Sequence, residues 1–171
     1  MLELGPLIRD IPDFPKKGIL FKDITTLLKD PRAFKQSIDQ LTDLVKAYTP
    51  DKVIGMESRG FIFAAPIAYK LDAGFVPVRK LGKLPGDVIS TEYDLEYGTN
   101  TLELHSDGIS AGDRVLIVDD LLATGGTVSA TIELVERLEG KVVAVAFLVE
   151  LTTLNGRDRL GDYNVVSLLK F

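Results

Sequence analysis

Residues 115–127 read VLIVDDLLATGGT, and this stretch decides the fold that the sequence predicts. The run from 114 to 118 is almost wholly apolar, as in a strand that is buried on both faces of a sheet. Asp119 and Asp120 follow, and small residues with two glycines then lead into a segment whose apolar residues recur at helical spacing, at Val128, Ile132, Val135 and Leu138. The sequence therefore predicts a buried strand, a polar loop and a helix, in that order.

The same alternation extends in both directions from this stretch. Asp30 followed by Pro31 is typical of a helix cap and first turn, and a helical apolar pattern then runs to Tyr48. A second helix is expected at 60–71. Apolar runs predict a short buried strand at 52–56 and further strands at 75–78, 142–148 and 165–169.

Three other segments have weaker patterns. Residues 4–11 can form a short helix that Pro12 and Pro15 stop. Residues 91–97 and 101–105 alternate around a Gly-Thr-Asn turn, which indicates a hairpin or two extended arms. Between them and the preceding strand, KLGKLPGDVI at 80–89 is basic and lacks apolar periodicity, so we expect a mobile surface loop there.

Together these elements predict an α/β fold with a mostly parallel central sheet flanked by helices. The 171 residues fit one domain, 1–171, and no repeat or linker divides them. In such sheets ligands bind beyond the carboxyl ends of the strands, where Asp119 and Asp120 stand.

Composition excludes several classes of function. The formal charge of -5 gives no electrostatic footprint for nucleic acid. There is no cysteine, and the single His105 rules out a histidine-rich metal cluster. The N-terminus lacks the pattern of a signal peptide, and no apolar run is long enough to cross a bilayer. We therefore expect a cytoplasmic protein that binds neither nucleic acid nor membrane.

The loop after the central strand has the chemistry of a sugar-phosphate site. The adjacent carboxylates of Asp119 and Asp120 offer only acceptors, which suit the hydroxyls of a ribose. The backbone N–H groups at the start of the next helix favour an anion. A phosphate is therefore expected at the loop residues Ala123, Thr124, Gly125, Gly126 and Thr127.

A second anion site is expected at 55–60, GMESRG, because this segment also joins a strand to a helix. It has the glycine spacing of a P-loop, but Phe61 and Ile62 replace the required Lys and Ser or Thr, and no GxGxxG exists. Nucleoside triphosphates and dinucleotides are thereby excluded. Taken alone, Arg59 fits a surface salt bridge as well as a ligand contact.

The whole of VLIVDDLLATGGT resembles the phosphoribosyl-diphosphate signature of type I phosphoribosyltransferases. Other segments resemble those of the adenine phosphoribosyltransferases within that family: FPKKGILFKDI at 14–24, GMESRG at 55–60, RKLGKLPG at 79–86 and YDLEYG at 93–98. Members often carry Asp where Glu57 stands. The resemblance runs from 14 to 127 and implies a small N-terminal base-binding hood (1–30) and a mobile catalytic loop (80–98).

The resemblance also implies roles for individual residues. It places Glu96 near the base as an acid or base, although a solvent-facing residue on an alternating strand is an equal alternative. Cationic stabilisation of the leaving diphosphate is assigned to Arg59, Lys80 and Lys83. It also implies a cis peptide between Glu57 and Ser58. The remaining substrate contacts are expected at Glu57, Ser58, Arg79, Leu121, Leu20, Phe21 and Lys22.

The implied reaction converts adenine and 5-phosphoribosyl diphosphate into AMP and diphosphate, with Mg²⁺ held mainly by the substrate rather than by protein ligands. The family resemblance further implies a homodimer. Two alternatives are weighed against this: transfer to another base such as xanthine or guanine, and a ligand-sensing regulator that binds DNA. The second would need a DNA-reading element, for which this acidic chain has no room.

Overall fold

The computed structural model describes residues 2–94 and 99–171. The chain divides into two compact units, residues 1–40 and 41–171, and each is considered by itself. The helix α2 (Pro31–Val45) begins in the first unit and ends in the second. Among the described residues, no helix is long and apolar enough to cross a membrane.

The N-terminal unit contains a two-stranded antiparallel hairpin. After the 3-10 helix η1 (Gly5–Leu7), strand β1 (Arg9–Pro12) pairs with β2 (Leu20–Asp23), and α1 (Thr25–Leu28) follows. The expected helix at 4–11 is therefore wrong beyond its first turn. The second half of that segment instead pairs with β2, with Arg9 opposite Asp23 and Pro12 opposite Leu20.

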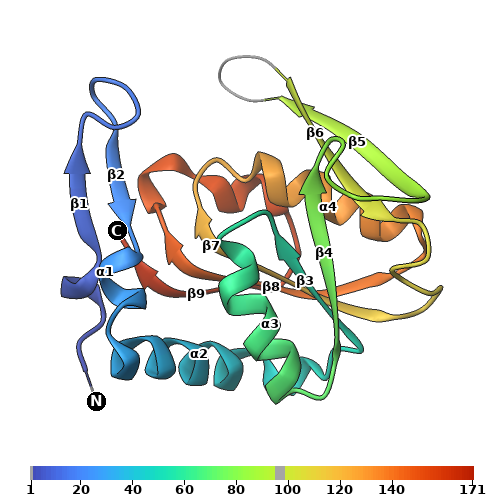
Figure 1. The fold of residues 1–171 in the computed structure, drawn as a ribbon, viewed down its shortest axis with the longest axis horizontal. Helices are drawn as coiled ribbons and strands as arrows, with labels where there is room; N and C mark the ends of the chain where they lie inside the picture. The colour runs from blue at the N-terminus through green and yellow to red at the C-terminus, as the bar shows by residue number, and fades with distance from the viewer. Residues whose placement is uncertain (1, 95–98) are drawn as a thin grey trace. The chain divides into compact units, whose positions relative to one another are not determined.

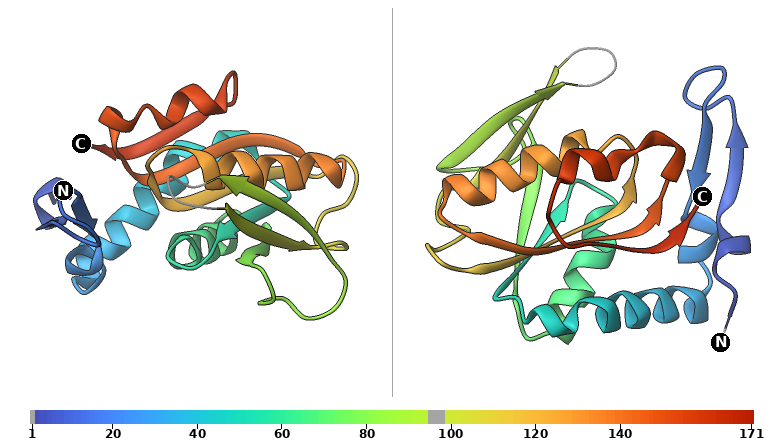
Figure 2. Two further views of the ribbon diagram at one scale, coloured as in Figure 1. Left: turned by 90° about the horizontal axis from the view of Figure 1, so that it is seen from above. Right: turned by 180° about the vertical axis from the view of Figure 1, so that it is seen from behind.

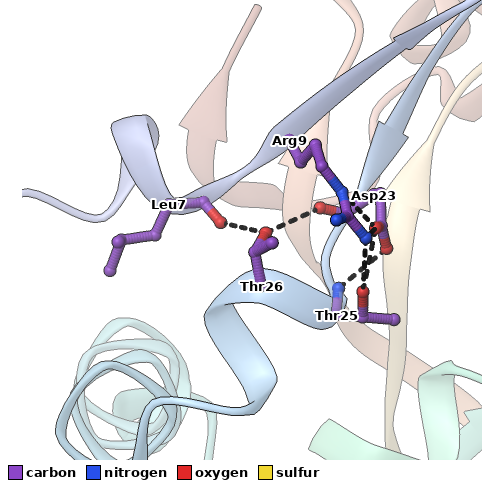
Figure 3. Close-up of polar contacts among 5 residues, drawn as sticks. All are labelled: Leu7, Arg9, Asp23, Thr25 and Thr26. Carbon is purple, nitrogen blue, oxygen red and sulfur yellow. Dashed lines mark hydrogen bonds and ion pairs between the residues drawn. The ribbon is translucent and has the colours of Figure 1, made fainter.

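Asp23 fastens the open end of this hairpin to the helix that follows (Figure 3). Its carboxylate accepts hydrogen bonds from Arg9 Nε at 3.0 Å, from the Thr25 backbone N–H at 2.9 Å and from Thr25 Oγ1 at 2.8 Å. The Thr26 hydroxyl donates to Leu7 O at 2.6 Å. The hydrogen bonds to the Asp23 carboxylate lower its pKa to about 2, and the bond from the Thr25 N–H contributes most, followed by that from Arg9.

The expected cap of α2 is confirmed. Asp30 Oδ1 accepts hydrogen bonds from the N–H groups of Arg32 at 2.9 Å and Ala33 at 3.1 Å, which lower the pKa of Asp30. Pro31 occupies the first position, where its missing N–H leaves no helical bond unmade. A 3-10 turn, η2 (Lys46–Tyr48), extends the helix to the predicted end.

The C-terminal unit contains a seven-stranded sheet in the described residues, with the order β5-β6-β4-β3-β7-β8-β9 (Figure 1). The five strands β4, β3, β7, β8 and β9 are parallel to their neighbours in this order. Beside β4, strands β6 and β5 add an antiparallel edge. The strands are β3 (Lys52–Met56), β4 (Gly74–Lys80), β5 (Val88–Asp94), β6 (Thr99–His105), β7 (Arg114–Leu122), β8 (Lys141–Glu150) and β9 (Val165–Lys170). The α/β fold and the strands expected at 52–56, 75–78, 114–118, 142–148 and 165–169 are confirmed, although β9 is only half-buried.

Helices cover the two faces of this sheet. The chain passes from β3 through α3 (Gly60–Lys70) to β4 on one side, and from β7 through α4 (Gly126–Arg137) to β8 on the other. Right-handed crossovers in opposite directions place the helices on opposite faces, as seen from above in Figure 2. The strand order reverses between β3 and β7, and ligands bind at such a switch point.

The hairpin expected beyond the basic loop is also present. Strand β5 pairs with β6 from Val88 opposite His105 to Asp94 opposite Thr99. Thr99 and Asn100 thus belong to a strand rather than to the expected turn. Residues 95–98, with the predicted base-contacting Glu96, lie outside the described residues.

Candidate active site

A cavity of about 460 Å³ lies at the carboxyl ends of the central strands, beside the switch point. Segments far apart in the sequence converge on it because their strands are neighbours in the sheet. Its lining residues are Glu57, Ser58, Arg59, Lys80, Tyr93, Asn100, Leu102, Asp119, Asp120, Leu121 and Thr127.

The acid pair lies inside β7 rather than after it. We expected the strand to end at 118, but pairing with β8 continues from Asp119 opposite Phe147 to Leu122 opposite Glu150. On the other side, pairing with β3 ends at Val118. Asp119 therefore stands where β7 extends past β3, next to the first residue of α3. A Cβ at Gly60 would lie 2.7 Å from Asp119 Oδ1, so this close approach requires glycine.

Both carboxylates have few donors from the protein. Asp119 Oδ1 accepts the Asp120 N–H at 2.9 Å. The buried Asp120 Oδ2 lies 2.9 Å from Arg59 Nε in an ion pair, but no aligned hydrogen bond reaches this oxygen from the described residues. Burial, more than any other influence, raises the pKa of both acids, and the neighbouring Asp120 charge raises that of Asp119 further. Hydroxyl donors on a ligand would relieve this deficit.

The predicted phosphate loop joins β7 to α4. Gly125 precedes the helix with φ of +83°, a conformation that glycine adopts without steric cost. A hollow of about 80 Å³ is lined by all five expected loop residues, together with Asp119, Leu121 and others. The loop opens at the N-terminal end of a twelve-residue helix, where unpaired N–H groups favour an anion. The acid pair and an anion cradle thus share one edge.

The second anion loop departs partly from expectation. The Glu57–Ser58 peptide is cis, as expected. The Glu57 carboxylate accepts hydrogen bonds from the Lys80 N–H at 2.8 Å and from Arg79 Nε at 3.3 Å. Burial raises the pKa of Glu57, but these two donors outweigh it and the net shift is downward. Glu57 therefore ties the loop to the end of β4, and Ser58, Arg59 and Lys80 are the polar groups that line the cavity beside it.

Other expected residues are placed elsewhere. Lys83 does not line the cavity; its carbonyl accepts a hydrogen bond from Arg79 at 3.1 Å. Leu20, Phe21 and Lys22 form strand β2 of the N-terminal unit. There the Phe21 ring packs edge-on against Phe14 with centroids 5.2 Å apart, and Lys22 Nζ lies 2.6 Å from Asp10 Oδ1.

Sequence reasoning missed Tyr93 and Asn100 as cavity residues. They are directly opposite in the β5–β6 pairing, so their side chains project from the same face of the hairpin. The alternating pattern of 91–97 does place Tyr93 on the same face of the strand as Thr91. Which of the two faces points toward the cavity depends on how the hairpin packs in the sheet, and the sequence does not show this. His105 lies outside this cavity, and its Nε2 is 2.8 Å from Pro85 O.

Among the described residues no group of three or more His, Asp and Glu side chains is arranged to hold a metal ion. The cavity combines two carboxylates with two cations, Arg59, which is ion-paired with Asp120, and Lys80, and an anion cradle lies beside them. This arrangement can hold a phosphorylated sugar by its hydroxyls and a second anionic group by the cations.

Comparisons with known proteins agree with this geometry. The sequence profile of the Phosphoribosyl transferase domain matches residues 23–170. The adenine phosphoribosyltransferase of Alkaliphilus metalliredigens is 59% identical over 170 residues, which cover 99% of this chain and 100% of that one. The enzyme of the same name from a Synechococcus strain is 56% identical over 170 residues, with 99% of each chain covered.

Solved structures are similar over nearly the whole chain. The adenine phosphoribosyltransferase of Thermoanaerobacter pseudethanolicus is 55% identical, with a TM-score of 0.96 and 98% of each chain covered. That of Saccharomyces cerevisiae, complexed with an imino-altritol bisphosphate and adenine, is 40% identical, with a TM-score of 0.93 and 97% of this chain and 96% of that one covered. The chain therefore belongs to the adenine phosphoribosyltransferase family of type I phosphoribosyltransferases.

Proposed function

We propose that this protein transfers the 5-phosphoribosyl group of 5-phosphoribosyl diphosphate to adenine, giving AMP and diphosphate in purine salvage. The observation that carries the proposal is the acid pair in β7, continuous with an anion cradle and facing Arg59 and Lys80. The relatives named above support adenine as the acceptor.

In this reaction a bond forms between adenine N9 and C1 of the ribose, and the C1–O bond breaks with its electron pair leaving on diphosphate. Asp119 and Asp120 would accept hydrogen bonds from the ribose hydroxyls and hold the sugar in register. The loop at 123–127 would hold the 5-phosphate through its N–H groups and the hydroxyls of Thr124 and Thr127. Leu121 would offer an apolar contact between the two.

The leaving diphosphate gains negative charge as the C1–O bond breaks. Arg59 and Lys80 line the cavity and would stabilise that charge, with the Ser58 hydroxyl as a further donor. Lys83 belongs to the segment that follows β4, and Arg79, near the end of β4, donates to its carbonyl; we assign both to the same anion when that segment closes over it. Glu57 contributes by holding Arg79 and Lys80 in place.

Mg²⁺ is proposed to accompany the diphosphate. The residues fit a metal that the substrate carries, because Asp119 and Asp120 supply oxygen ligands only as a pair, and the burial that raises the pKa of both favours added positive charge beside them. When bound, the ion neutralises charge on the diphosphate. Removal of Mg²⁺ with a chelator should abolish turnover, and full activity in its absence would contradict the proposal.

The adenine ring requires a place for the proton that N9 loses. We assign this proton to Glu96 of the 93–98 segment, and adenine contacts to Leu20, Phe21 and Lys22 in β2. Glu96→Gln keeps the shape and removes the charge, so kcat should fall much more than the KM for 5-phosphoribosyl diphosphate rises. An unchanged kcat across the working pH range would leave Glu96 without a catalytic role.

We also propose a homodimer in the cytoplasm. The exposed aromatic side chains of Tyr69 and Phe75, on α3 and β4, support an interface on the C-terminal unit. Sedimentation equilibrium should give twice the mass of the chain, and cell fractionation should place the protein in the cytoplasm. A monomer at assay concentration, or a membrane-bound fraction, would contradict these assignments.

A purine-competition assay with labelled 5-phosphoribosyl diphosphate tests the function. With adenine, guanine, hypoxanthine and xanthine present together, the label should enter AMP, with one diphosphate released for each AMP. Preferential labelling of another nucleotide would favour a different base, and hydrolysis without nucleotide formation would overturn the proposal.

A further inference from the structure

The C-terminal segment 155–161 carries no sequence motif, yet it touches the phosphate loop backbone to backbone. Gly156 is buried at the start of the 3-10 helix η4 (Gly156–Leu160), and a Cβ placed on it would lie 2.2 Å from Ala123 O. Conversely, a Cβ on Gly125 would lie 2.6 Å from Gly156 O. The two loops fit together only because both residues lack side chains at this contact.

The residue after Gly156 fixes that contact to the sheet. Arg157 Nε and Nη2 bind the two carboxylate oxygens of Glu150 at 2.6 and 2.8 Å. Arg157 Nη1 donates to Val165 O at 2.9 Å and Nη2 to Ser167 Oγ at 3.2 Å. Ser167 Oγ donates to Glu150 Oε2 at 2.5 Å. We name the set Glu150, Arg157 and Ser167 the C-terminal clamp.

The clamp joins η4 to the two strands beyond β7 in the sheet, because Glu150 belongs to β8 and Ser167 to β9. Glu150 ends β8 opposite Leu122, the last residue of β7, and also pairs with Lys170 of β9. Ala123 follows Leu122 directly, so the phosphate loop and its clamp start from the neighbouring ends of β7 and β8. Glu150 is only 5% exposed, and its bonds with Arg157 are the main cause of its lowered pKa. A two-pronged pair of this kind fixes orientation as well as distance.

We propose that Glu150, Arg157 and Ser167 are positioning residues that hold Gly156 against Ala123 and Gly125, and so set the shape in which the loop receives a 5-phosphate. The inference rests on the proposed function of that loop as the phosphate site. Arg157 acts through Gly156 and has no contact with substrate. The ligand affected is the phosphate end of any phosphorylated ribose, whereas the adenine site is unaffected.

The test compares Arg157→Lys, which keeps the charge but loses the two-pronged geometry, with Asn164→Ala. Asn164 lies in the same C-terminal region, where its amide donates to Val143 O at 3.1 Å, and serves as a control for general loosening. Calorimetry with ribose 5-phosphate should give a Kd about tenfold weaker for Arg157→Lys and unchanged for Asn164→Ala. The KM for adenine should change less than about twofold in both variants.

Equal affinity for ribose 5-phosphate in wild type and a folded Arg157→Lys variant would overturn the inference, and so would equal weakening in Asn164→Ala. If Arg157→Lys does not fold, Ser167→Ala removes the two hydrogen bonds of the Ser167 hydroxyl, leaves the Glu150–Arg157 pair, and should still weaken the binding of ribose 5-phosphate about twofold. No change in that variant would likewise overturn the proposal.

Hydrogen exchange separates this inference from the proposed function, because it needs no ligand. The amide of Ser129, which donates to Gly125 O of the loop at 3.0 Å, should exchange faster in Arg157→Lys than in wild type, while the amides of β3 should not change. Unchanged exchange at Ser129 would overturn the clamp. A wild type that binds no ribose 5-phosphate but has the expected exchange difference would overturn the assigned function and leave the clamp intact.

Discussion

Two carboxylate sites in this molecule have opposite electrostatics. In the N-terminal unit, Asp23 accepts hydrogen bonds from Arg9 and Thr25, and its pKa is lowered to about 2. In the C-terminal unit, the half-buried Asp119 and the buried Asp120 have few donors, and their pKa values are raised. A carboxylate whose bonds are completed within the protein stabilises the fold, whereas one that lacks donors destabilises it until a ligand supplies them.

The contrast predicts opposite effects of the same substitution, Asp to Asn, at the two sites. The largest effect is expected at the acid pair. Asp120→Asn or Asp119→Asn should lower kcat/KM for 5-phosphoribosyl diphosphate by about 10- to 100-fold, because a charged acceptor for a ribose hydroxyl is lost. The free energy of unfolding at pH 7 should stay constant or rise, because a poorly solvated charge is removed.

The pH dependence of that gain follows from the direction of the shift. A carboxyl whose folded pKa lies above its unfolded value destabilises the fold progressively as pH rises from the unfolded pKa, and the destabilisation is complete above the folded pKa. The stabilisation in the Asn variants should therefore be present at pH 7 and vanish below the ordinary aspartate pKa of 3.8. Urea unfolding and turnover on the same samples, with the exposed Asp43→Asn as control, check both results. Loss of stability with full activity would reverse the assignment.

Gly125→Ala is expected to have the second largest effect. The added methyl meets Gly156 O at 2.6 Å, and a φ of +83° costs alanine about 1–2 kcal/mol. Affinity for AMP by calorimetry should fall about tenfold or more. Gly112→Ala is the matched control, since Gly112 has a φ of +84° and nothing within 4 Å of an added methyl. If both variants bind AMP like the wild type, the phosphate does not lie at this loop.

Asp23→Asn should act on stability rather than on the chemistry of phosphoribosyl transfer. The free energy of unfolding at pH 7 should fall by about 1 kcal/mol, a small figure because the Arg9 side chain is 56% exposed. Because the folded pKa lies below the unfolded one, the contribution is complete above pH 3.8 and is lost as pH falls toward 2. The variant should thus have a flatter stability curve between pH 4 and 2. An unchanged curve would show that Asp23 does not couple to folding, and Asp10→Asn supplies the exposed comparison.

The smallest effects are expected at the cavity residues that the sequence did not reveal. Asn100→Ala and Tyr93→Phe each remove one polar group of the cavity wall, and kcat/KM should fall about two- to tenfold without loss of stability. Steady-state kinetics of the two variants, with Asn164→Ala as the control, measure this change in kcat/KM. Wild-type kinetics in both would mean that the hairpin lines the cavity without contacting substrate.

The parts of this fold that the sequence predicts are those with local causes. The apolar run before Asp119 predicts a buried strand, and Asp30 with Pro31 predicts a helix start, because each pattern carries its own physical requirement. The helix predicted at 4–11 was wrong because its second half depends on a distant partner. Strand β1 forms because β2 pairs with it, and β2 begins eight residues beyond Pro12.

The candidate site divides in the same way. Glycines at the strand-to-helix junctions predicted the two anion loops, and the position of the acid pair after an apolar run predicted its place at a strand end. The extension of β7 through Leu122, the role of Glu57 as a tie to β4 and the contact of Gly156 with Ala123 depend on which strands are neighbours. No local pattern encodes those neighbours, so these features required the structure.

A crystal structure of the protein with bound AMP would locate both ends of the ribose phosphate. The 5-phosphate should lie within hydrogen-bonding distance of the backbone N–H groups of 124–127, and the ribose hydroxyls should donate to Asp119 and Asp120. A 5-phosphate seated instead on Ser58 and Arg59, or ribose hydroxyls that leave both aspartates without a donor, would contradict this placement.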